Sequence, residues 1–308
     1  MEDSLRPDSL EGYIGQEHIK TPLAAALVSA KARKAAFPHM LVSGPPGLGK
    51  TTLALIIAKE MGGGLVQAVG TGMTSPKHVM YQLLVTSQRP FQVLFVDEVH
   101  RMRSPVQEAL YIPMEDGMLL GSWGKKPMPP WTLIGATTDL GKLQQPFRDR
   151  FQVQFSLQFY GVEDLAEIAK KSAEKLGLVF EELALIELAR RSRGTPRFVN
   201  NYLKWIRDFV IYDKVEGVIV KDTVQDILWD ELRVDDMGLR DDDRRVLQAL
   251  AGSSGSLGLD TLSNKVLMSD VTVQESIEPY LIYAGFMDRE KWGRVITEKG
   301  RQWIENAR

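Results

Sequence analysis

The chain of 308 residues contains no cysteine, and its four histidines show no metal-ligand spacing. Disulfides and thiolate metal sites are therefore excluded, which suits a reducing compartment. The N-terminus is acidic where a secretory signal peptide would be basic, and no apolar run approaches the length of a membrane-spanning helix. We therefore expect a cytoplasmic protein that does not associate with membranes.

A strong net charge of either sign is also missing. The chain has 38 Lys and Arg against 40 Asp and Glu, a formal net charge of −2. A protein-wide basic field is thus excluded, and any contact with nucleic acid must come from a local patch. The composition is 44% hydrophobic and 25% charged, as in ordinary globular proteins, and the length is enough for two or three domains.

One glycine-rich motif is present, Gly44-Pro45-Pro46-Gly47-Leu48-Gly49-Lys50-Thr51-Thr52. It follows a short apolar run and precedes a helical pattern, so it predicts a strand, a turn and a helix start. Glycines allow backbone N–H groups to approach phosphate oxygens, and the helix N-terminus adds partial positive charge. Lys50 could reach the β- and γ-phosphates, and the Thr51 hydroxyl could bind Mg²⁺. A chance glycine-rich turn is the alternative, and the strand–helix context favours nucleotide binding.

The first half of the chain alternates apolar strands with amphipathic helices, which predicts an α/β domain with a parallel P-loop sheet. The strand candidates are nearly continuous in apolar residues, as buried parallel strands are. They are His39–Ser43, Leu65–Val69, Gln92–Val96, Thr132–Ala136 and, more weakly, Val153–Leu157.

The second half divides into two further patterns. Apolar residues at helical spacing from about residue 160 to 232 predict a small helical domain. From about residue 236 on, three helices are followed by a hairpin, an arrangement that predicts a winged helix-turn-helix. These elements are expected at Arg244–Leu250, Asp260–Lys265, Asp270–Ala284 and Phe286–Ile296.

Two acidic residues end a predicted buried strand at Val93-Leu94-Phe95-Val96-Asp97-Glu98. At the carboxyl end of such a strand, Asp97 could help to hold Mg²⁺ and Glu98 could polarise an attacking water as a general base. A strand that runs into an acidic turn is the plain alternative. A phosphate loop upstream makes the catalytic interpretation much stronger.

Three further sites have weaker signals. Thr137-Thr138 ends the next strand, where a hydroxyl could orient the water, or could simply terminate the strand. Arg148 and Arg150 lie near a helix-to-strand junction, where one could stabilise transition-state charge at a neighbouring subunit's nucleotide. A local Arg–Asp pair is the alternative. Arg197 lies near a helix N-terminus, an unfavourable place for a cation, which hints at a function rather than simple solvation.

The hairpin at the end of the chain carries Arg289, Lys291 and Arg294 around Trp292. Basic residues beside an aromatic side chain suit contact with the phosphate backbone of a nucleic acid. Acidic residues interleave with them, so an ordinary charged hairpin is a real competitor.

Together these residues resemble the RuvB family of AAA+ ATPases, the Holliday-junction branch-migration motors. The resemblance extends almost from end to end, and its two most specific runs are Arg191–Arg197 and Glu278–Ile282. The other matching segments are Leu5-Arg6-Pro7, Tyr13–Gln16, Gly44–Thr52, Asp97–Arg101, Met114–Asp116, Leu133–Thr138, Arg148–Phe151 and Phe159-Tyr160.

The resemblance implies a role for each matching residue. Leu5, Arg6, Tyr13 and Ile14 would border the adenine, and Lys50, Thr51 and Thr52 would hold the phosphates and Mg²⁺, with Gly44, Gly47 and Gly49 in the loop. Asp97 and Glu98 would be the Walker B pair, Thr138 sensor 1, Arg197 sensor 2 and Tyr160 a neighbour of the nucleotide at the lid hinge. Arg150, with Arg148 as second choice, would be the trans-acting arginine finger, and Arg289 and Arg294 would follow the DNA backbone.

One segment departs from the family pattern. Residues 117–130 are shorter than the β-hairpin with which family members dock on RuvA. This puts a RuvA-like partner in doubt. Trp123 at the expected tip could anchor a partner, because Trp is enriched at interface hot spots, or could fold back over the shortened turn.

We therefore expect three domains: an AAA+ large ATPase domain over residues 1–158, a helical lid over 159–235 and a winged-helix DNA-binding domain over 236–308. The expected function is an ATP- and Mg²⁺-dependent motor on double-stranded DNA or a four-way junction. A trans-acting finger requires a neighbour and hence a ring, for which a hexamer is the expected form. An AAA+ loader or remodeller, or a non-motor regulator switched by ATP, are the alternatives.

Overall fold

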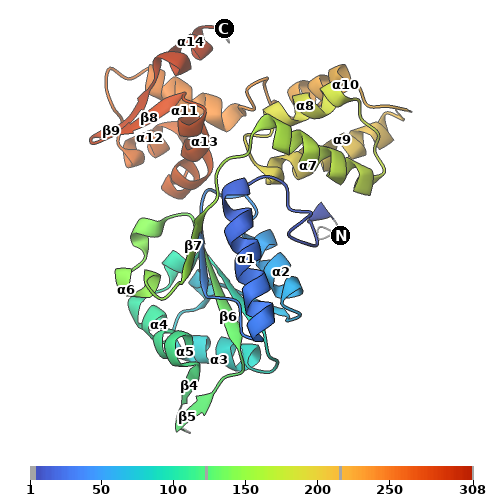
Figure 1. Cartoon of the computed structure of the whole chain (residues 1–308). Coiled ribbons are helices and arrows are strands. Elements are labelled where there is room, and N and C mark those ends of the chain that lie inside the picture. Colours follow the sequence, from blue (N-terminus) through green and yellow to red (C-terminus); the bar gives the residue numbers. More distant parts are fainter. Residues whose placement is uncertain (1–4, 122–123, 215–216, 307–308) are drawn as a thin grey trace. The chain divides into compact units, whose positions relative to one another are not determined.

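The computed structural model describes residues 5–121, 124–214 and 217–306. By its internal contacts the chain forms two compact units. The first extends from the N-terminal segment to Gln158, apart from Pro45–Gly47. The second contains Pro45–Gly47 and everything from Phe159 onward. Figure 1 draws the whole chain.

The first unit is built on a five-stranded sheet with the order β2-β3-β6-β1-β7, and every pair of neighbouring strands is parallel. The strands are β1 (Met40–Ser43), β2 (Leu65–Val69), β3 (Gln92–Asp97), β6 (Trp131–Thr137) and β7 (Val153–Ser156). All five predicted strands are confirmed, and no end differs by more than 1 residue. The α/β P-loop architecture is therefore confirmed.

Burial explains why these strands could be predicted from the sequence. Every residue of β1 and β6 is buried, so each reads as a continuous apolar run. A buried polar residue, His39, lies just before β1. Its Nδ1 accepts a hydrogen bond from the Leu133 N–H at 2.8 Å. Burial lowers the pKa of His39 to about 4, so the ring remains neutral and acts as an acceptor.

Helices lie on both sides of the sheet (Figure 1). They are α1 (Glu17–Arg33), α2 (Lys50–Glu60), α3 (Pro76–Thr86), α4 (Ser104–Glu108), α5 (Tyr111–Asp116) and α6 (Gln145–Arg148), with short 3-10 turns η2 (Gly70–Gly72), η3 (Val99–Arg101) and η4 (Leu140–Lys142). One buried cluster joins Leu41 and Leu133 of the strands to Val79, Val106 and Phe147 of the helices. This core fixes the carboxyl ends of the strands, where ligands bind in open α/β sheets.

The shortened segment after α5 is a hairpin of β4 (Met118–Gly121) and β5 (Gly124–Pro127), paired antiparallel from Met118 with Pro127 to Gly121 with Gly124. Leu119 is buried, whereas the side chains of β5 are exposed. Trp123, the candidate partner anchor, lies outside the described residues.

The helical part of the second unit contains α7 (Val162–Leu176), α8 (Glu182–Arg191), α9 (Pro196–Tyr212), α10 (Lys221–Asp226) and a π-helical turn, η5 (Ile227–Glu231). Gly177 ends α7 with φ 72°, a left-handed conformation that suits glycine. Pro196 occupies the first turn of α9, where its missing N–H costs nothing. The predicted helical lid is present.

The remainder is the winged helix: α11 (Asp241–Ala251), α12 (Leu259–Val266), η6 (Thr272–Ile277), α13 (Glu278–Tyr283), β8 (Met287–Glu290), β9 (Gly293–Ile296) and α14 (Glu298–Asn306). Two expectations were wrong in detail. The helix expected at Asp270–Ala284 contains the π-helical turn η6 just before Pro279, because proline has no N–H for the regular ladder. The helix expected from Arg244 begins at Asp241, where three aspartates favour a helix N-terminus.

Within the residues that the structure describes, no helix is both long and apolar enough to cross a bilayer.

Candidate nucleotide site and wing

The glycine-rich loop joins β1 to α2 through three left-handed glycines, Gly44 (φ 138°), Gly47 (φ 87°) and Gly49 (φ 102°). A Cβ on Gly44 would also lie 2.7 Å from the Leu157 carbonyl oxygen. These positions require glycine, and a run of such conformations allows backbone N–H groups to point toward one anion. The loop therefore fits a bound phosphate chain.

Lys50 is the first residue of α2 and is almost fully buried. Its Nζ donates a hydrogen bond to the Gly44 carbonyl at 2.7 Å, which holds the ammonium over the loop. Thr51 and Thr52 follow in the first turn of α2 and are half-buried. The cation, the hydroxyls and the helix N-terminus together make an anion-binding end.

Asp97 ends β3, and Glu98 follows in a left-handed conformation with φ 50° and ψ 44°. The Asp97 Oδ1 accepts a hydrogen bond from the Glu98 N–H at 3.0 Å. Such a conformation is strained for a residue with a side chain, and strain of this kind gathers at functional sites.

Gly70, at the end of β2, makes room for that turn. A Cβ at this position would lie 2.2 Å from the Glu98 carbonyl oxygen. Sequence analysis missed this residue, although a glycine directly after an apolar strand is the kind of signal that marks a close backbone approach.

The Glu98 carboxylate lies in a polar but poorly satisfied setting. Its Oε2 is 3.4 Å from both His100 Nε2 and Arg101 Nε, and this buried oxygen accepts no hydrogen bond from the described residues. Buried acceptors are normally hydrogen-bonded, so an orphaned one needs an explanation. A role of the Glu98 carboxylate as a proton acceptor for a water molecule would explain the unpaired oxygen.

His100 links Glu98 to the end of β6. Its Nδ1 lies 2.9 Å from the Thr137 Oγ1, and its pKa is lowered, chiefly by burial, although the Glu98 charge raises it. The Thr137 hydroxyl also contacts the backbone of Asp139, donating to its carbonyl and accepting from its N–H, each at 3.0 Å. Thr137 is thus committed to local structure, while the half-buried Thr138 lies directly beyond the strand. No signal in the sequence marks His100, because the four histidines have no common spacing.

Arg150 lies just after α6 and packs against its own subunit. Its guanidinium carbon is 3.7 Å from the Tyr111 ring centroid, one Nη is 3.1 Å from the Glu115 carboxylate and the other donates to the Pro146 carbonyl at 2.5 Å. Neither Arg148 nor Arg150 has an acceptor for its buried Nε among the described residues. Both arginines are at the predicted junction, and Arg150 is the one held by an aromatic ring and a carboxylate.

The residues expected near the adenine differ in exposure. Leu5 and Tyr13 are buried, and Arg6 and Ile14 are half-buried. The Tyr13 hydroxyl donates a long hydrogen bond, 3.5 Å, to the Leu48 carbonyl. Nearby, the Gln16 amide donates to the Gln158 carbonyl at 2.6 Å and accepts from its N–H at 3.0 Å. This amide clamp holds the N-terminal segment to the end of the first unit.

Two further predicted residues belong to the second unit. Tyr160 is buried, and its N–H donates to the Gly194 carbonyl at 2.9 Å. Arg197 is exposed in the first turn of α9, as its sequence position indicated. A Cβ on Gly194, which has φ 66°, would lie 3.0 Å from the Phe159 ring, so the loop before α9 is closely packed.

The β8–β9 hairpin is the wing of the winged helix, and its two arginines, Arg289 and Arg294, share one buried carboxylate. Glu278 is 1% exposed, and its two oxygens lie 2.5 Å from the guanidinium groups of Arg289 and Arg294. The Arg294 side chain is 11% exposed and that of Arg289 is 48% exposed. Arg294 therefore anchors the wing, a role that sequence analysis did not foresee, and Arg289 remains better placed for a phosphate.

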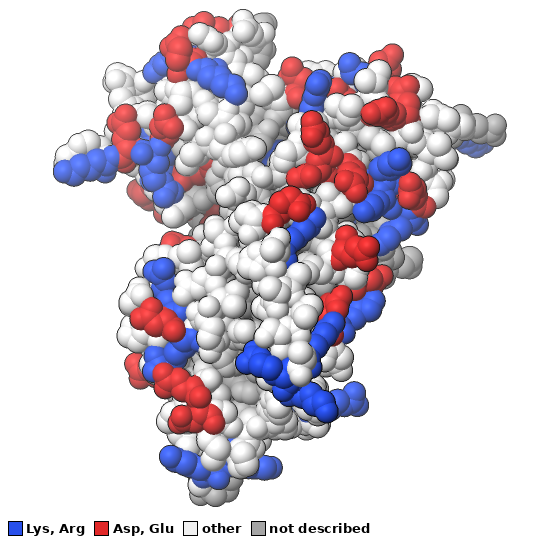
Figure 2. Space-filling view, in the orientation of Figure 1, with Lys and Arg blue, Asp and Glu red and all other residues white. Residues whose placement is uncertain are grey.

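The turn between β8 and β9 presents Trp292, which is 77% exposed, with the Lys291 ammonium 4.9 Å from its ring centroid. On the face drawn in Figure 2, Lys and Arg are mixed with Asp and Glu over most of the surface, with one continuous group of Lys and Arg at the lower right. A DNA contact is therefore expected to be as local as the small net charge indicated.

We predict that Arg289→Ala weakens duplex binding by a similar factor for unrelated DNA sequences, because a phosphate contact carries no base information. The slope of log affinity against log salt should fall by about 1. Leaving Arg294 on Glu278 avoids an unpaired buried charge. Filter binding at several salt concentrations, with Arg301→Ala as an exposed control, measures the effect. A loss confined to certain sequences would contradict it.

Comparison with known proteins places this geometry in a family. Residues 5–157 match the model for the Holliday junction DNA helicase RuvB P-loop domain, 160–235 the RuvB AAA lid domain and 236–305 the RuvB C-terminal winged helix domain. A Holliday junction branch migration complex subunit RuvB of Lactobacillus johnsonii is 40% identical over 97% of this chain and 90% of its own length. A subunit of the same name from Synechococcus is 42% identical over 97% and 86%.

Solved structures agree. The Thermotoga maritima RuvB Holliday junction branch migration motor superposes with a TM-score of 0.90 at 38% identity, covering 98% of each chain. Family models cover nearly the whole sequence, and relatives match it along almost their full length. This chain belongs to the RuvB family.

Proposed function

We propose that this chain is an ATP-driven motor that translocates duplex DNA and so migrates Holliday junctions in recombination and repair. The observation that carries the proposal is the buried Oε2 of Glu98, which has no hydrogen-bond donor among the described residues, beside Asp97 at the carboxyl end of β3. A phosphate loop alone serves switches and carriers as well as motors. A hydrolytic base next to the loop's sheet favours turnover.

The nucleotide is ATP with Mg²⁺. The loop glycines Gly44, Gly47 and Gly49 and the residues Lys50, Thr51 and Thr52 would hold its phosphates, with the Thr51 hydroxyl and the Asp97 carboxylate as metal ligands. The metal neutralises phosphate charge when it is bound. Leu5, Arg6, Tyr13, Ile14 and Tyr160 would border the base. The three left-handed glycines and the buried ammonium of Lys50 support this assignment.

Glu98 accepts a proton from the attacking water, which becomes a stronger nucleophile as it loses that proton. His100, kept neutral by burial, adds no positive charge beside the Glu98 carboxylate. Thr138, half-buried just beyond β6, would orient the water through its hydroxyl. The chain thus supplies base and orientation from neighbouring strands.

Two arginines complete hydrolysis. Arg150 reaches the nucleotide of a neighbouring subunit, which requires a ring, and a hexamer is the expected form. To act in trans, its guanidinium exchanges Glu115 and Tyr111 for the phosphates. Arg197, exposed at the start of α9, senses the nucleotide from the lid.

Three domains share the work: the ATPase domain over 1–158, the lid over 159–235 and the winged helix over 236–308. The wing follows the backbone of double-stranded DNA through Arg289, with Arg294 as its anchor. The absence of cysteine fits work in the cytoplasm. The short β4–β5 hairpin leaves a RuvA-like partner in doubt, so the test includes RuvA as a variable.

The test measures ATP hydrolysis and strand exchange on a mobile four-way junction, with and without RuvA. The motor is expected to hydrolyse ATP faster with the junction than without DNA and to convert the junction to duplex products. A linear duplex of equal length is the control substrate. Hydrolysis without junction movement, in every combination, would favour a loader or remodeller instead.

A further inference from the structure

Arg193 lies in the loop between α8 and α9 and is 1% exposed. It adopts a left-handed conformation, φ 52°, which is uncommon outside glycine. A buried guanidinium in a strained backbone conformation requires strong compensating contacts. Arg193 lies in the same short run as Arg191 and Arg197, yet the three side chains have different surroundings.

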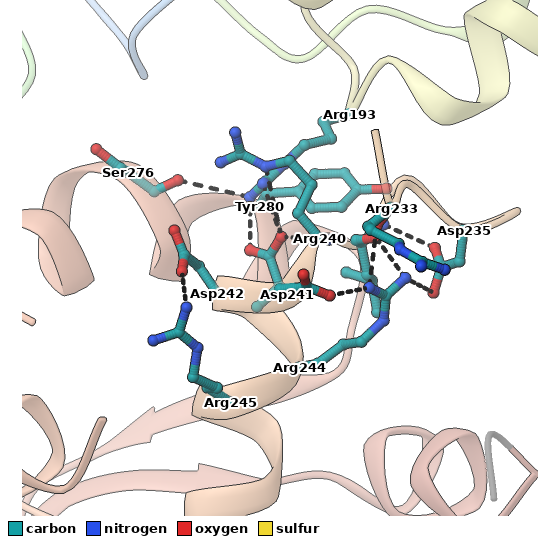
Figure 3. A network of polar contacts seen from close by, with 12 residues as sticks. Arg193, Arg233, Asp235, Arg240, Asp241, Asp242, Arg244, Arg245, Ser276 and Tyr280 are labelled. Atoms are coloured by element: carbon teal, nitrogen blue, oxygen red, sulfur yellow. Dashed lines mark hydrogen bonds and ion pairs between the residues drawn. The ribbon is translucent and has the colours of Figure 1, made fainter. Parts of the chain in front are cut away.

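The compensation comes from the winged helix. Arg193 donates to both carboxylate oxygens of Asp243, at 2.9 and 3.0 Å. Its Nη2 also donates a longer bond, 3.5 Å, to the Ser276 carbonyl (Figure 3). The guanidinium carbon lies 4.6 Å from the Tyr280 ring centroid and 5.3 Å from that of Phe198. Asp243 is completely buried. The pair is therefore dry, bidentate and flanked by aromatic rings.

These partners lead directly to the wing. Asp243 lies in the first turn of α11, where it also accepts a hydrogen bond from the Arg240 N–H at 2.9 Å. Ser276 is two positions before Glu278, the carboxylate that holds Arg289 and Arg294. Displacement of Arg193 would thus move both the start of α11 and the segment that anchors the wing.

Toward the nucleotide side, a short and closely packed loop joins Arg193 to Arg197. Gly194 is packed against Phe159, and the Thr195 N–H donates to the Ser192 carbonyl at 3.0 Å. Pro196 then fixes the entry into α9. A shift of Arg197 is consequently transmitted along the backbone to Arg193.

Stability alone does not explain this pair. Desolvation of two buried charges largely cancels their attraction, and well-packed apolar residues often serve a fold as well. A bidentate pair also fixes one geometry between the two parts that it joins, here the loop before α9 and the winged helix.

We infer that Arg193 is a positioning residue that couples the Arg197 loop to the winged helix, so that lid movement becomes movement of the wing. The inference rests on the proposed function of the chain as a DNA motor. Through the Asp243 pair, the lid and the winged helix move together during each hydrolysis cycle. No contact of Arg193 with nucleotide or DNA is required.

The test variant is Arg193→Gln with Asp243→Asn. It removes both charges and leaves neutral amides in their place, and the amide oxygen at position 243 remains an acceptor for the Arg240 N–H. The matched control is Arg245→Gln with Asp242→Asn, an exposed ion pair of 3.0 Å on the same helix. We expect the test variant to keep its basal ATPase while junction movement per ATP falls by about tenfold, a typical coupling factor. The control should match the parent.

Arg193→Lys retains the charge but cannot form the bidentate contact, so it should lie between the parent and the double variant. Undiminished junction movement per ATP in a folded double variant would overturn the inference. An equal loss of basal ATPase would also overturn it, because the defect would then lie in hydrolysis and not in coupling.

A second measurement is independent of motor activity. The chain has no cysteine, so spin labels can be placed at Glu174→Cys in α7 and Asp260→Cys in α12. We expect a narrow distance distribution in the parent and the control pair, and a broad one in Arg193→Gln with Asp243→Asn. A narrow distribution in all three would contradict the coupling even if the chain proves not to be a motor, and a broadened one would support it.

Discussion

Glu98→Gln is expected to bind ATP like the parent and to hydrolyse it about 10²–10⁴-fold more slowly, the usual contribution of a general base. The amide has the shape of the carboxylate but cannot take a proton from water. Its backbone keeps the left-handed turn that Gly70 accommodates, so the loop and the nucleotide affinity are preserved. Single-turnover hydrolysis and equilibrium binding of labelled ATP measure the two properties separately.

Glu108→Gln, at an exposed position of α4, is the matched control and should hydrolyse ATP like the parent. Equal turnover in Glu98→Gln and the parent would eliminate the general-base role. Loss of ATP binding in Glu98→Gln would instead indicate that the carboxylate supports the fold of the β3 end.

If Arg150 is a trans-acting arginine finger, Arg150→Ala is expected to lower hydrolysis by roughly 10³-fold or more while each subunit still binds nucleotide. Rings mixed from Arg150→Ala and Glu98→Gln subunits should regain part of the activity. In such a ring, an intact Glu98 of one subunit can face an intact Arg150 of the next. The measurement is steady-state ATPase across mixing ratios.

The local contacts of Arg150 provide the control. Glu115→Gln removes its ion pair but leaves the guanidinium free to reach a neighbour. If Arg150 acts in trans, Glu115→Gln keeps its activity. If Glu115→Gln loses as much as Arg150→Ala, or mixed rings show no recovery, the arginine serves its own subunit.

The sequence predicts elements whose pattern is set by burial. β3 and β6 lie inside the sheet, so their apolar runs and their polar ends at Asp97 and Thr137 could be located from the residues alone. The loop from Gly44 to Thr52 could be predicted in the same way, because only glycine suits its left-handed turns. Local chemistry was enough in these places.

Contacts between residues that are far apart in the sequence could not be predicted from local patterns. Nothing near His100 in the sequence indicates that it touches both Glu98 and Thr137, and nothing near Arg294 indicates that Glu278 holds it. A long-range pair depends on which elements the fold brings together, and single-residue patterns do not encode this. The same holds for Tyr111 beneath Arg150.

The two glycines at the ends of η2 have opposite tolerance for change. A Cβ at Gly70 would collide with the Glu98 backbone, whereas the space around a Cβ at Gly72 is open to 4 Å. Position 70 is therefore closed to every other amino acid, and position 72 is free to vary. A substitution at Gly70 would therefore disturb the backbone of Glu98 from the end of a neighbouring strand, although Gly70 lies outside the glycine-rich loop and outside the Asp97-Glu98 pair.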